Sequence, residues 1–140
     1  MATTNQDVGK RFLDEVLNGH NLSVIDETLT DDFVYIDATI GTFEGRAVFK
    51  TLMTYFLVAF PDLVWTVEQE IYEGDTTVSR YSWTATNDGE YRSRPATHKR
   101  VTVNGVSINE YRNGKLAETR NLRDDLSLML QMGAISELSI

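Results

Sequence analysis

The stretch RAVFKTLMTYFLVAFPDLVWTVEQEIY, residues 46–72, contains the change of pattern that decides the fold. Up to Pro61 the apolar residues recur at helical spacing, which predicts a buried helix over Arg46–Phe60 that the proline closes. From Leu63 onward the period is two, and valine, threonine and aromatic residues become frequent, as in strands. The chain therefore changes from helices to a sheet at this point.

Downstream of that change the sequence predicts a run of long strands. The four strands are Leu63–Tyr72, Thr76–Thr86, Lys99–Arg112 and Lys115–Leu122. Tight turns at 73–75 and 113–114 and a longer polar loop over 87–97 connect them. Strands joined in this way form an antiparallel meander.

The third long strand has an irregular pattern. Its apolar positions change parity, from Val101 and Val103 to Val106 and Ile108. We expect a β-bulge at Gly105 to reconcile the two halves and to bend the sheet. A curved sheet with helices on its concave side leaves a cavity, so a pocket is predicted there.

Upstream of residue 46 the pattern is mainly helical. Apolar residues predict a first helix over 8–17, ended by the turn Asn18–Asn21. Asn21 caps a short second helix over 22–29, and a short strand Phe33–Asp37 follows. A glycine-bearing loop over 40–45 precedes the third helix.

The chain closes with a short helix that Asp124 caps and Gly133 ends. Three helices, a curved and mainly antiparallel sheet, and this terminal helix together predict an α+β domain. A length of 140 residues suits one such domain and leaves too little chain for a second core.

Composition excludes several classes of function. The formal net charge of −8 disfavours binding to nucleic acid or to an anionic membrane. The basic residues of 92–100 form one local exception, either a solvated loop or a contact for an anionic ligand. Without cysteine the chain can form no disulfide and no thiolate nucleophile. No apolar stretch is long enough to span a membrane and no leader pattern is present, so we expect a soluble, cytoplasmic protein.

Cofactor motifs are missing as well. The sequence contains no Gly-rich phosphate loop, no nucleophile elbow and no nucleotide fingerprint. Its two histidines, His20 and His98, are not at metal-ligand spacing. We therefore expect no cofactor and no metal.

Four motifs resemble the SnoaL-like polyketide cyclases of the nuclear-transport-factor-2-like superfamily: FPDL at 60–63, KRVTV at 99–103, NGKL at 113–116 and LMLQMG at 128–133. The resemblance implies a single cone-shaped domain over 1–140, in which helices and concave sheet enclose an apolar pocket for a small hydrophobic molecule. It also implies a homodimer through the outer sheet face. The superfamily includes cyclases, ketosteroid isomerases, dehydratases, epoxide hydrolases and binding modules, so the fold alone names no reaction.

The founding cyclases carry His-Arg-Asp where this chain has Thr119-Arg120-Asn121, and their aspartate is the general acid/base. Asn121 cannot exchange protons near neutral pH, but it can donate a hydrogen bond to an enolate or carbonyl oxygen. The accompanying histidines of those cyclases look like Ser107 and Thr119 here. The founding chemistry therefore does not transfer unchanged.

A second resemblance, to ketosteroid isomerases, covers DDFVYID at 31–37 and matches their aspartate base to Asp37. We expect partial burial at the end of this strand to raise the pKa of Asp37 toward a useful range. The alternative is a solvated strand-end carboxylate. The tyrosine of the isomerases' oxyanion hole looks like Phe12, so Asn121, Asn109 or Tyr35 must supply the donor.

These residues define a candidate site with Asp37 as base and Asn121 as hydrogen-bond donor. The predicted substrate-binding residues are Tyr35, Tyr55, Phe60, Trp83, Ser107, Asn109 and Thr119. The sequence thus predicts a cofactor-independent acid–base enzyme that cyclises, isomerises or dehydrates a small hydrophobic polyketide- or terpenoid-like substrate. Alternatives are a non-catalytic ligand-binding module of the same fold and a cofactor-free polyketide hydroxylase.

Overall fold

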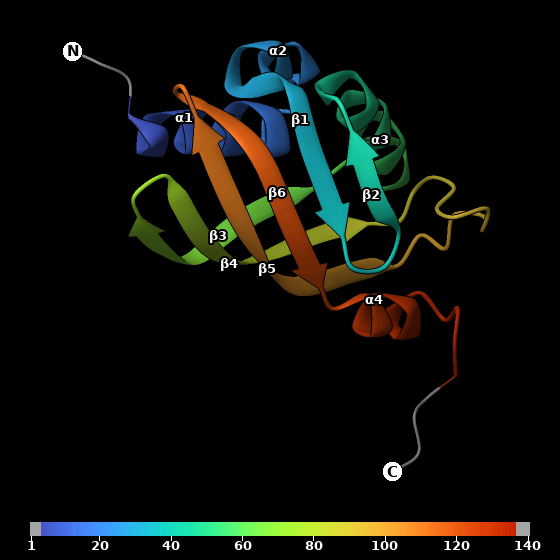
Figure 1. Cartoon of the computed structure of the whole chain (residues 1–140). Coiled ribbons are helices and arrows are strands. Elements are labelled where there is room, and N and C mark those ends of the chain that lie inside the picture. Colours follow the sequence, from blue (N-terminus) through green and yellow to red (C-terminus); the bar gives the residue numbers. More distant parts are fainter. Residues whose placement is uncertain (1–3, 137–140) are drawn as a thin grey trace.

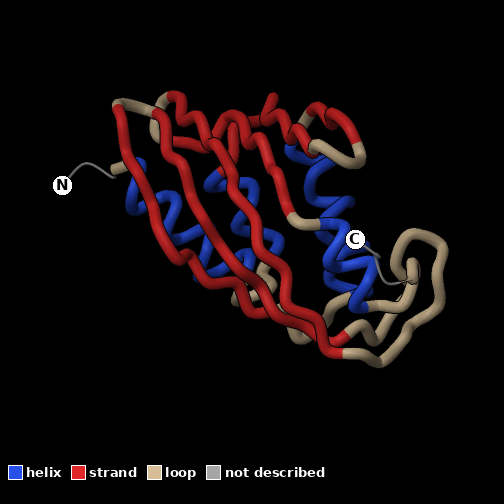
Figure 2. The backbone as a smooth tube through the Cα atoms, turned by 90° about the horizontal axis from the view of Figure 1, so that it is seen from below, coloured by secondary structure: helices blue, strands red, loops and turns tan. Residues whose placement is uncertain are grey.

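A six-stranded sheet curves around the helices of the N-terminal half in the computed structural model, which describes residues 4–136 (Figures 1 and 2). The strands are β1 Leu29–Asp37, β2 Gly41–Glu44, β3 Val64–Glu73, β4 Thr76–Thr86, β5 Arg100–Arg112 and β6 Lys115–Arg123. Their order in the sheet is β2-β1-β6-β5-β4-β3, and only the pairing of β1 with β6 is parallel. The predicted α+β architecture is confirmed.

The helices begin and end close to the predicted residues. They are α1 Asn5–Arg11, continued by a π-helical turn over Phe12–Leu17, then a 3-10 turn over Leu22–Val24, α2 Ile25–Thr28, α3 Arg46–Ala59 and α4 Asp125–Gln131. Both predicted caps form, because Asn21 accepts from the Ser23 amide and Asp124 from the Ser127 amide. Within residues 4–136 no helix is long and apolar enough to span a membrane.

The first two strands differ from the prediction. β1 begins at Leu29, four residues before the predicted start at Phe33, and the predicted loop over 40–45 contains β2. Leu29 pairs with Leu116 across the parallel ladder with β6. Such a contact depends on a distant segment, and the four residues of β2 are too few to show a period.

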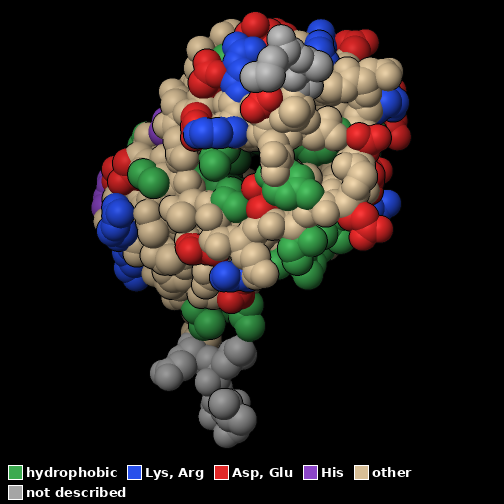
Figure 3. Space-filling view, turned by 90° about the vertical axis from the view of Figure 1, so that its left-hand side faces the viewer, with side chains coloured by type: hydrophobic (Ala, Val, Ile, Leu, Met, Phe, Trp, Pro, Cys, Tyr) green, Lys and Arg blue, Asp and Glu red, His purple; other side chains and the backbone are tan. Residues whose placement is uncertain are grey.

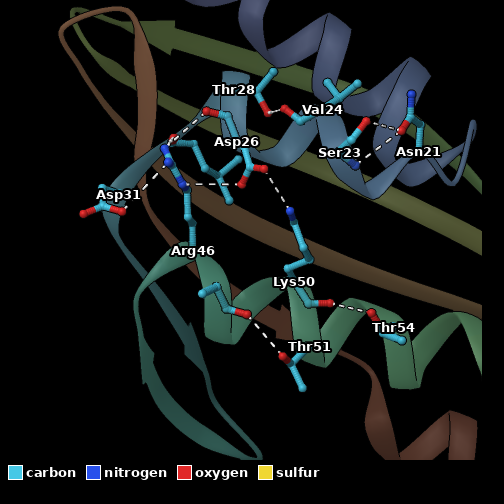
Figure 4. Close-up of polar contacts among 12 residues, drawn as sticks. Asn21, Ser23, Val24, Asp26, Thr28, Asp31, Arg46, Lys50, Thr51 and Thr54 are labelled. Atoms are coloured by element: carbon cyan, nitrogen blue, oxygen red, sulfur yellow. Dashed lines mark hydrogen bonds and ion pairs between the residues drawn. The ribbon is translucent and has the colours of Figure 1, made fainter.

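Salt bridges fix α3 against α2 on the outer side of the helical layer (Figure 4). Lys50 and Arg46 of α3 both reach Asp26 of α2, with Lys50 Nζ at 2.9 Å from Oδ2 and Arg46 Nε at 3.5 Å from Oδ1. Arg46 also donates to the carbonyl oxygen of Leu29, where β1 begins. These contacts hold the helical layer in position over the concave sheet.

The predicted bulge at Gly105 is wrong. The pairing of β5 with β4 runs without a shift from Arg100 to Glu110, and odd-numbered residues face inward throughout. Gly105 instead makes room for the Tyr81 ring, since an added Cβ would lie 2.3 Å from the Tyr81 hydroxyl oxygen. The change of parity has another cause: the inward face turns polar after Gly105, while Val106 and Ile108 are exposed on the convex face.

The convex face of the sheet carries exposed apolar side chains. Val106 and Leu122 stand opposite each other on β5 and β6, and Ile108 lies two residues along. Their exposed fractions are 37%, 63% and 42% for Val106, Leu122 and Ile108. Homodimerisation through this face stays a prediction.

Candidate active site

A cavity of about 1260 Å³ lies between the helices and the concave face of the sheet. The helices contribute an apolar roof, with Phe12 and Leu13 from the π-helical turn and Phe49, Met53 and Phe56 from α3. On the face formed by α1 and the β3–β4 hairpin, the surface is hollowed between hydrophobic side chains, with acidic side chains at the edge (Figure 3). A cavity with such an apolar roof suits a small hydrophobic ligand.

Polar side chains on the concave face of the sheet lie in two rows that the strand register creates, and most of them form the floor of the cavity. One row pairs Asp37, Asn121, Ser107, Ser79 and Glu70 from strand to strand. The neighbouring row pairs Tyr35, Thr119, Asn109, Thr77 and Tyr72 in the same way. An aromatic and aliphatic roof therefore faces a floor of hydroxyl, amide and carboxyl groups.

Asn121 lies at the centre of a hydrogen-bond chain at one end of this floor. Its Oδ1 accepts a hydrogen bond from the Tyr81 hydroxyl, and its Nδ2 donates to the Tyr35 hydroxyl oxygen at 3.0 Å. Tyr35 in turn donates to Asp37 Oδ2 at 3.0 Å. Each group in this series of hydrogen bonds donates to the next one, and the second proton of the Asn121 amide takes no part in the series.

Behind Tyr35, Asp37 belongs to a buried ionic triad. Arg123 Nη1 lies 2.7 Å from Asp37 Oδ2, and Arg123 Nε lies 2.8 Å from Oδ1 of Asp125. The exposed fractions of the Asp37, Arg123 and Asp125 side chains are 2%, 8% and 12%. Arg92 adds a second cation, with its Nη2 at 3.8 Å from Asp125 Oδ2, and Arg123 also reaches the Tyr35 hydroxyl at 3.5 Å.

Asp37 is buried, yet its pKa is not raised as the sequence predicts. Burial alone raises the pKa of this carboxyl, but the Arg123 charge and hydrogen bonds from the Thr39 and Ile40 amides and from Tyr35 outweigh it and hold the pKa below the ordinary 3.8. The turn after β1 supplies donors that the strand pattern does not reveal. Burial raises the pKa of Tyr35 to about 12, so its hydroxyl stays protonated near neutral pH.

The lowered pKa of Asp37 leads to a prediction about the stability of the fold at low pH. Because its folded-state pKa lies below its unfolded value, the Asp37 carboxylate stabilises the fold above about pH 4, and this contribution is lost as the pH falls through the folded-state pKa. The difference in unfolding free energy between wild type and Asp37→Asn should therefore shrink as the solution is acidified. Urea unfolding of both proteins between about pH 2 and 6 measures it, and a pH-independent difference contradicts the assignment.

Seven of the predicted site residues line the cavity: Tyr35, Tyr55, Trp83, Ser107, Asn109, Thr119 and Asn121. Among them Tyr55 is 70% exposed. Two predicted residues lie behind the lining. Phe60 is fully buried, with its ring centroid 5.1 Å from those of Trp83 and Tyr91, which stand in front of it. Asp37 lies behind Tyr35 and Arg123.

Sequence reasoning missed the roles of Arg123, Tyr81 and Glu70. The sequence does contain a signal for Arg123: it follows Asn121 by two residues, so both side chains face the same side of the strand. For Tyr81 the sequence holds no such signal, because nothing local shows that its hydroxyl crosses over Gly105 to reach β6. Glu70 lines the cavity because the β3 register shifts, which the sequence pattern conceals.

Three carboxylates line the cavity directly: Asp7, Glu70 and Glu90. Asp7 is engaged in the capping box of α1, where the Thr4 amide donates to its Oδ2 at 3.0 Å. Nowhere in residues 4–136 do three histidine, cysteine or acidic side chains gather as a metal site would require. The side chains at the site can supply hydrogen bonds and proton transfer.

Comparison with known proteins places this geometry among related folds. A family model of SnoaL-like polyketide cyclases matches residues 8–132. A search of curated proteins found no match.

Solved structures resemble the fold over nearly its whole length. A provisionally assigned SnoaL-like polyketide cyclase from Jannaschia sp. CCS1 is 26% identical, with a TM-score of 0.87 over 94% of this chain and 93% of that chain. AclR from Streptomyces galilaeus, provisionally assigned as a hydroxylase, is 25% identical, with a TM-score of 0.83 over 96% and 84%. IdmH from Streptomyces antibioticus, provisionally assigned as a polyketide cyclase, is 18% identical with a TM-score of 0.81 over 93% and 99%, a likeness of fold alone.

Proposed function

This chain belongs to the SnoaL-like polyketide cyclase family, and from that premise we propose that it is a cofactor-independent enzyme that forms an enolate. Its substrate is a small, hydrophobic, polyketide-like molecule with an acidic C–H bond. Cyclisation, isomerisation and dehydration all begin with such an enolate, and all three are open to this site.

One observation carries the proposal: a buried carboxylate is connected to the cavity wall through a single tyrosine hydroxyl. Tyr35, Asn121 and Arg123 line the wall, and Asp37 accepts the Tyr35 hydroxyl proton from behind. Enolate formation needs a proton acceptor and donors aimed at the oxygen where charge develops. Tyr35 with Asp37 supplies the acceptor, while the Asn121 amide and the Arg123 guanidinium supply donors.

In the proposed step the substrate C–H bond breaks and its proton passes to the Tyr35 oxygen. At the same time the Tyr35 hydroxyl proton passes to Asp37 Oδ2, and the electron pair of the C–H bond moves into the carbonyl group. The resulting enolate oxygen accepts hydrogen bonds from Asn121 and Arg123. The proton returns by the same route to the product, so no oxidant or reductant is consumed.

The lowered pKa of Asp37 restricts the substrate. A carboxylate that Arg123 stabilises is a weak base, so it accepts a proton readily only from an acidic carbon. A carbon between two carbonyl groups meets this requirement, and such carbons recur along polyketide chains. The restriction favours a polyketide-like substrate over a terpenoid-like one.

A non-catalytic binding module is the second candidate, and one observation favours it. At the Tyr35 end the Asp37 carboxylate lies behind the cavity wall. The Asn121 amide already donates a hydrogen bond to the Tyr35 hydroxyl. The stretch of wall formed by Tyr35, Asn121 and Arg123 exposes hydroxyl, amide and guanidinium groups, and such groups can bind oxygens without transferring protons. The experiment below separates the two candidates.

We expect wild-type protein to accelerate deuterium exchange at the carbon between the two carbonyls of N-(2-naphthyl)-3-oxobutanamide in heavy water. This probe carries an aromatic group for the apolar roof and needs no knowledge of the natural product. The acceleration should saturate with probe and reach at least about a thousandfold over buffer. Proton NMR measures the rate, and naphthalene fluorescence measures binding.

The matched variant is Tyr35→Phe, which removes the hydroxyl and keeps the ring. It should lose about a hundredfold in rate and bind the probe within about threefold of wild type. Saturable binding without any exchange would establish the binding module instead. Exchange that requires oxygen would favour the hydroxylase alternative, since the acid–base step proceeds equally well under anaerobic conditions.

A further inference from the structure

A β-bulge in β3 determines that Glu70 faces the cavity. Trp65 and Val67 line the cavity, and uninterrupted alternation would place Glu70 on the opposite, convex face. The pairing with β4 shifts by one residue after Val67, with Glu68 as the extra residue, so that Glu70 stands opposite the inward-facing Ser79. Bulges commonly re-aim a side chain in this way.

No cation neutralises Glu70 within the part of the chain that the structure describes. Lys10, which lines the same end of the cavity, is paired with Asp14 at 2.5 Å. Ser79 Oγ donates to Glu70 Oε1 at 3.3 Å. An ionised carboxylate has about four acceptor positions, so Glu70 retains capacity for donors from a ligand.

Glu70 and the Tyr35 wall lie at opposite ends of the polar floor. Glu70, Ser79, Ser107, Asn121 and Asp37 are registered across five neighbouring strands. Four strand spacings correspond to roughly 19 Å along the curved sheet. A ligand that reaches from one end to the other is therefore elongated, and each end meets different chemistry.

The surroundings of Glu70 combine this charge with aromatic rings. Tyr72 and Tyr111 line the same end of the cavity. Burial, and after it the Glu70 carboxylate, raises the pKa of both tyrosines to about 12, so both stay neutral. Neutral rings beside an uncompensated carboxylate suit an apolar ligand that ends in a hydrogen-bond donor.

From these observations we infer that Glu70 binds a donor group, a hydroxyl or a protonated amine, at the end of the ligand remote from Tyr35. The inference rests on the proposed function in taking the cavity as the substrate site, and it adds a specificity-determining residue to that site. Substrates that lack a donor at this end bind less tightly. Glu70 holds the ligand by hydrogen bonding and takes no part in the proton transfer at Tyr35.

Three matched naphthalene probes test the inference by binding alone: 2-(2-naphthyl)ethylamine, 2-(2-naphthyl)ethanol and the methyl ether of that alcohol. Wild type should bind the alcohol, the amine or both at least about fivefold more tightly than the ether, which has no donor. Glu70→Met should remove that preference and leave the affinity for the ether within about twofold. A preference for the amine identifies a cationic donor, and a preference for the alcohol a neutral one.

Glu68→Met is the control, because Glu68 is the extra residue of the bulge but accepts a hydrogen bond from Ser82, at 2.7 Å, instead of facing the cavity. It should behave as wild type with all three probes. Equal affinities of wild type for the three probes, or a preference that survives Glu70→Met, would overturn the inference. Because no turnover is measured, the Glu70 result stands apart from the exchange assay: loss of exchange with an intact donor preference rejects only the enzyme.

Discussion

Asp37→Asn lowers the rate of deuterium exchange of the naphthyl oxobutanamide probe at least about a hundredfold, as general acid–base catalysis requires, while the affinity for the probe stays within about threefold. The amide introduced at this position still accepts the Tyr35 hydrogen bond through its carbonyl oxygen, but it cannot take the proton. Tyr35, with a pKa of about 12, then has no route to release its own proton near neutral pH. Exchange followed by NMR and binding followed by fluorescence together measure this split.

A matched control lies on the same strand. Asp32→Asn changes a carboxylate whose side chain is 69% exposed and paired with Arg112, away from the cavity. Its exchange rate should equal that of wild type. If Asp37→Asn also retained the full rate, Asp37 would not be the proton acceptor and the relay would be rejected.

Arg123→Met destabilises the fold by about 3 kcal/mol, the second large effect that we expect. The change removes the cation that bridges the buried carboxylates of Asp37 and Asp125, so that Asp37 loses its cation and Asp125 keeps only the 3.8 Å contact with Arg92. The pKa of Asp37 should then rise, because burial is no longer opposed by the Arg123 charge. Urea unfolding near neutral pH measures the loss.

Two further variants test the cause of that loss of stability. Arg120→Met on the same strand removes a 58% exposed guanidinium and should cost less than about 0.5 kcal/mol. The double change Arg123→Met/Asp37→Asn removes one stranded anion together with the cation, so it should be more stable than Arg123→Met alone. A double variant that is less stable than Arg123→Met would show that charge burial is not the cause.

Local sequence patterns predict most of this fold because the deciding signals are local. The change of period at Pro61, the Asn21 and Asp124 caps and the tight turns each involve a few neighbouring residues, and each is found where predicted. The early start of β1, the short β2 and the bulge in β3 depend on pairing between distant segments. No window of sequence contains that information.

In the candidate site, too, local patterns predict some features and contacts between distant segments decide the others. Strand parity is enough to place Asn121, Ser107 and Asn109 on the cavity side. The pKa of Asp37 depends on Arg123 from β6 and on two amides of the following turn, which come together only in the fold. Gly105 resembles a bulge residue in the sequence, yet its role is to admit the Tyr81 ring from the neighbouring strand. Phe60 has the character of a pocket residue, but Trp83 and Tyr91 cover it.

The exchange rate of the double variant Tyr35→Phe/Asp37→Asn tests the central claim most directly. If Asp37 acts only through the Tyr35 hydroxyl, removing both groups costs no more than removing one, and the double variant should exchange at the rate of the slower single variant, about a hundredfold below wild type. A double variant that exchanges far more slowly than either single variant, down to the rate in buffer, would mean that the two groups act independently and would contradict the relay.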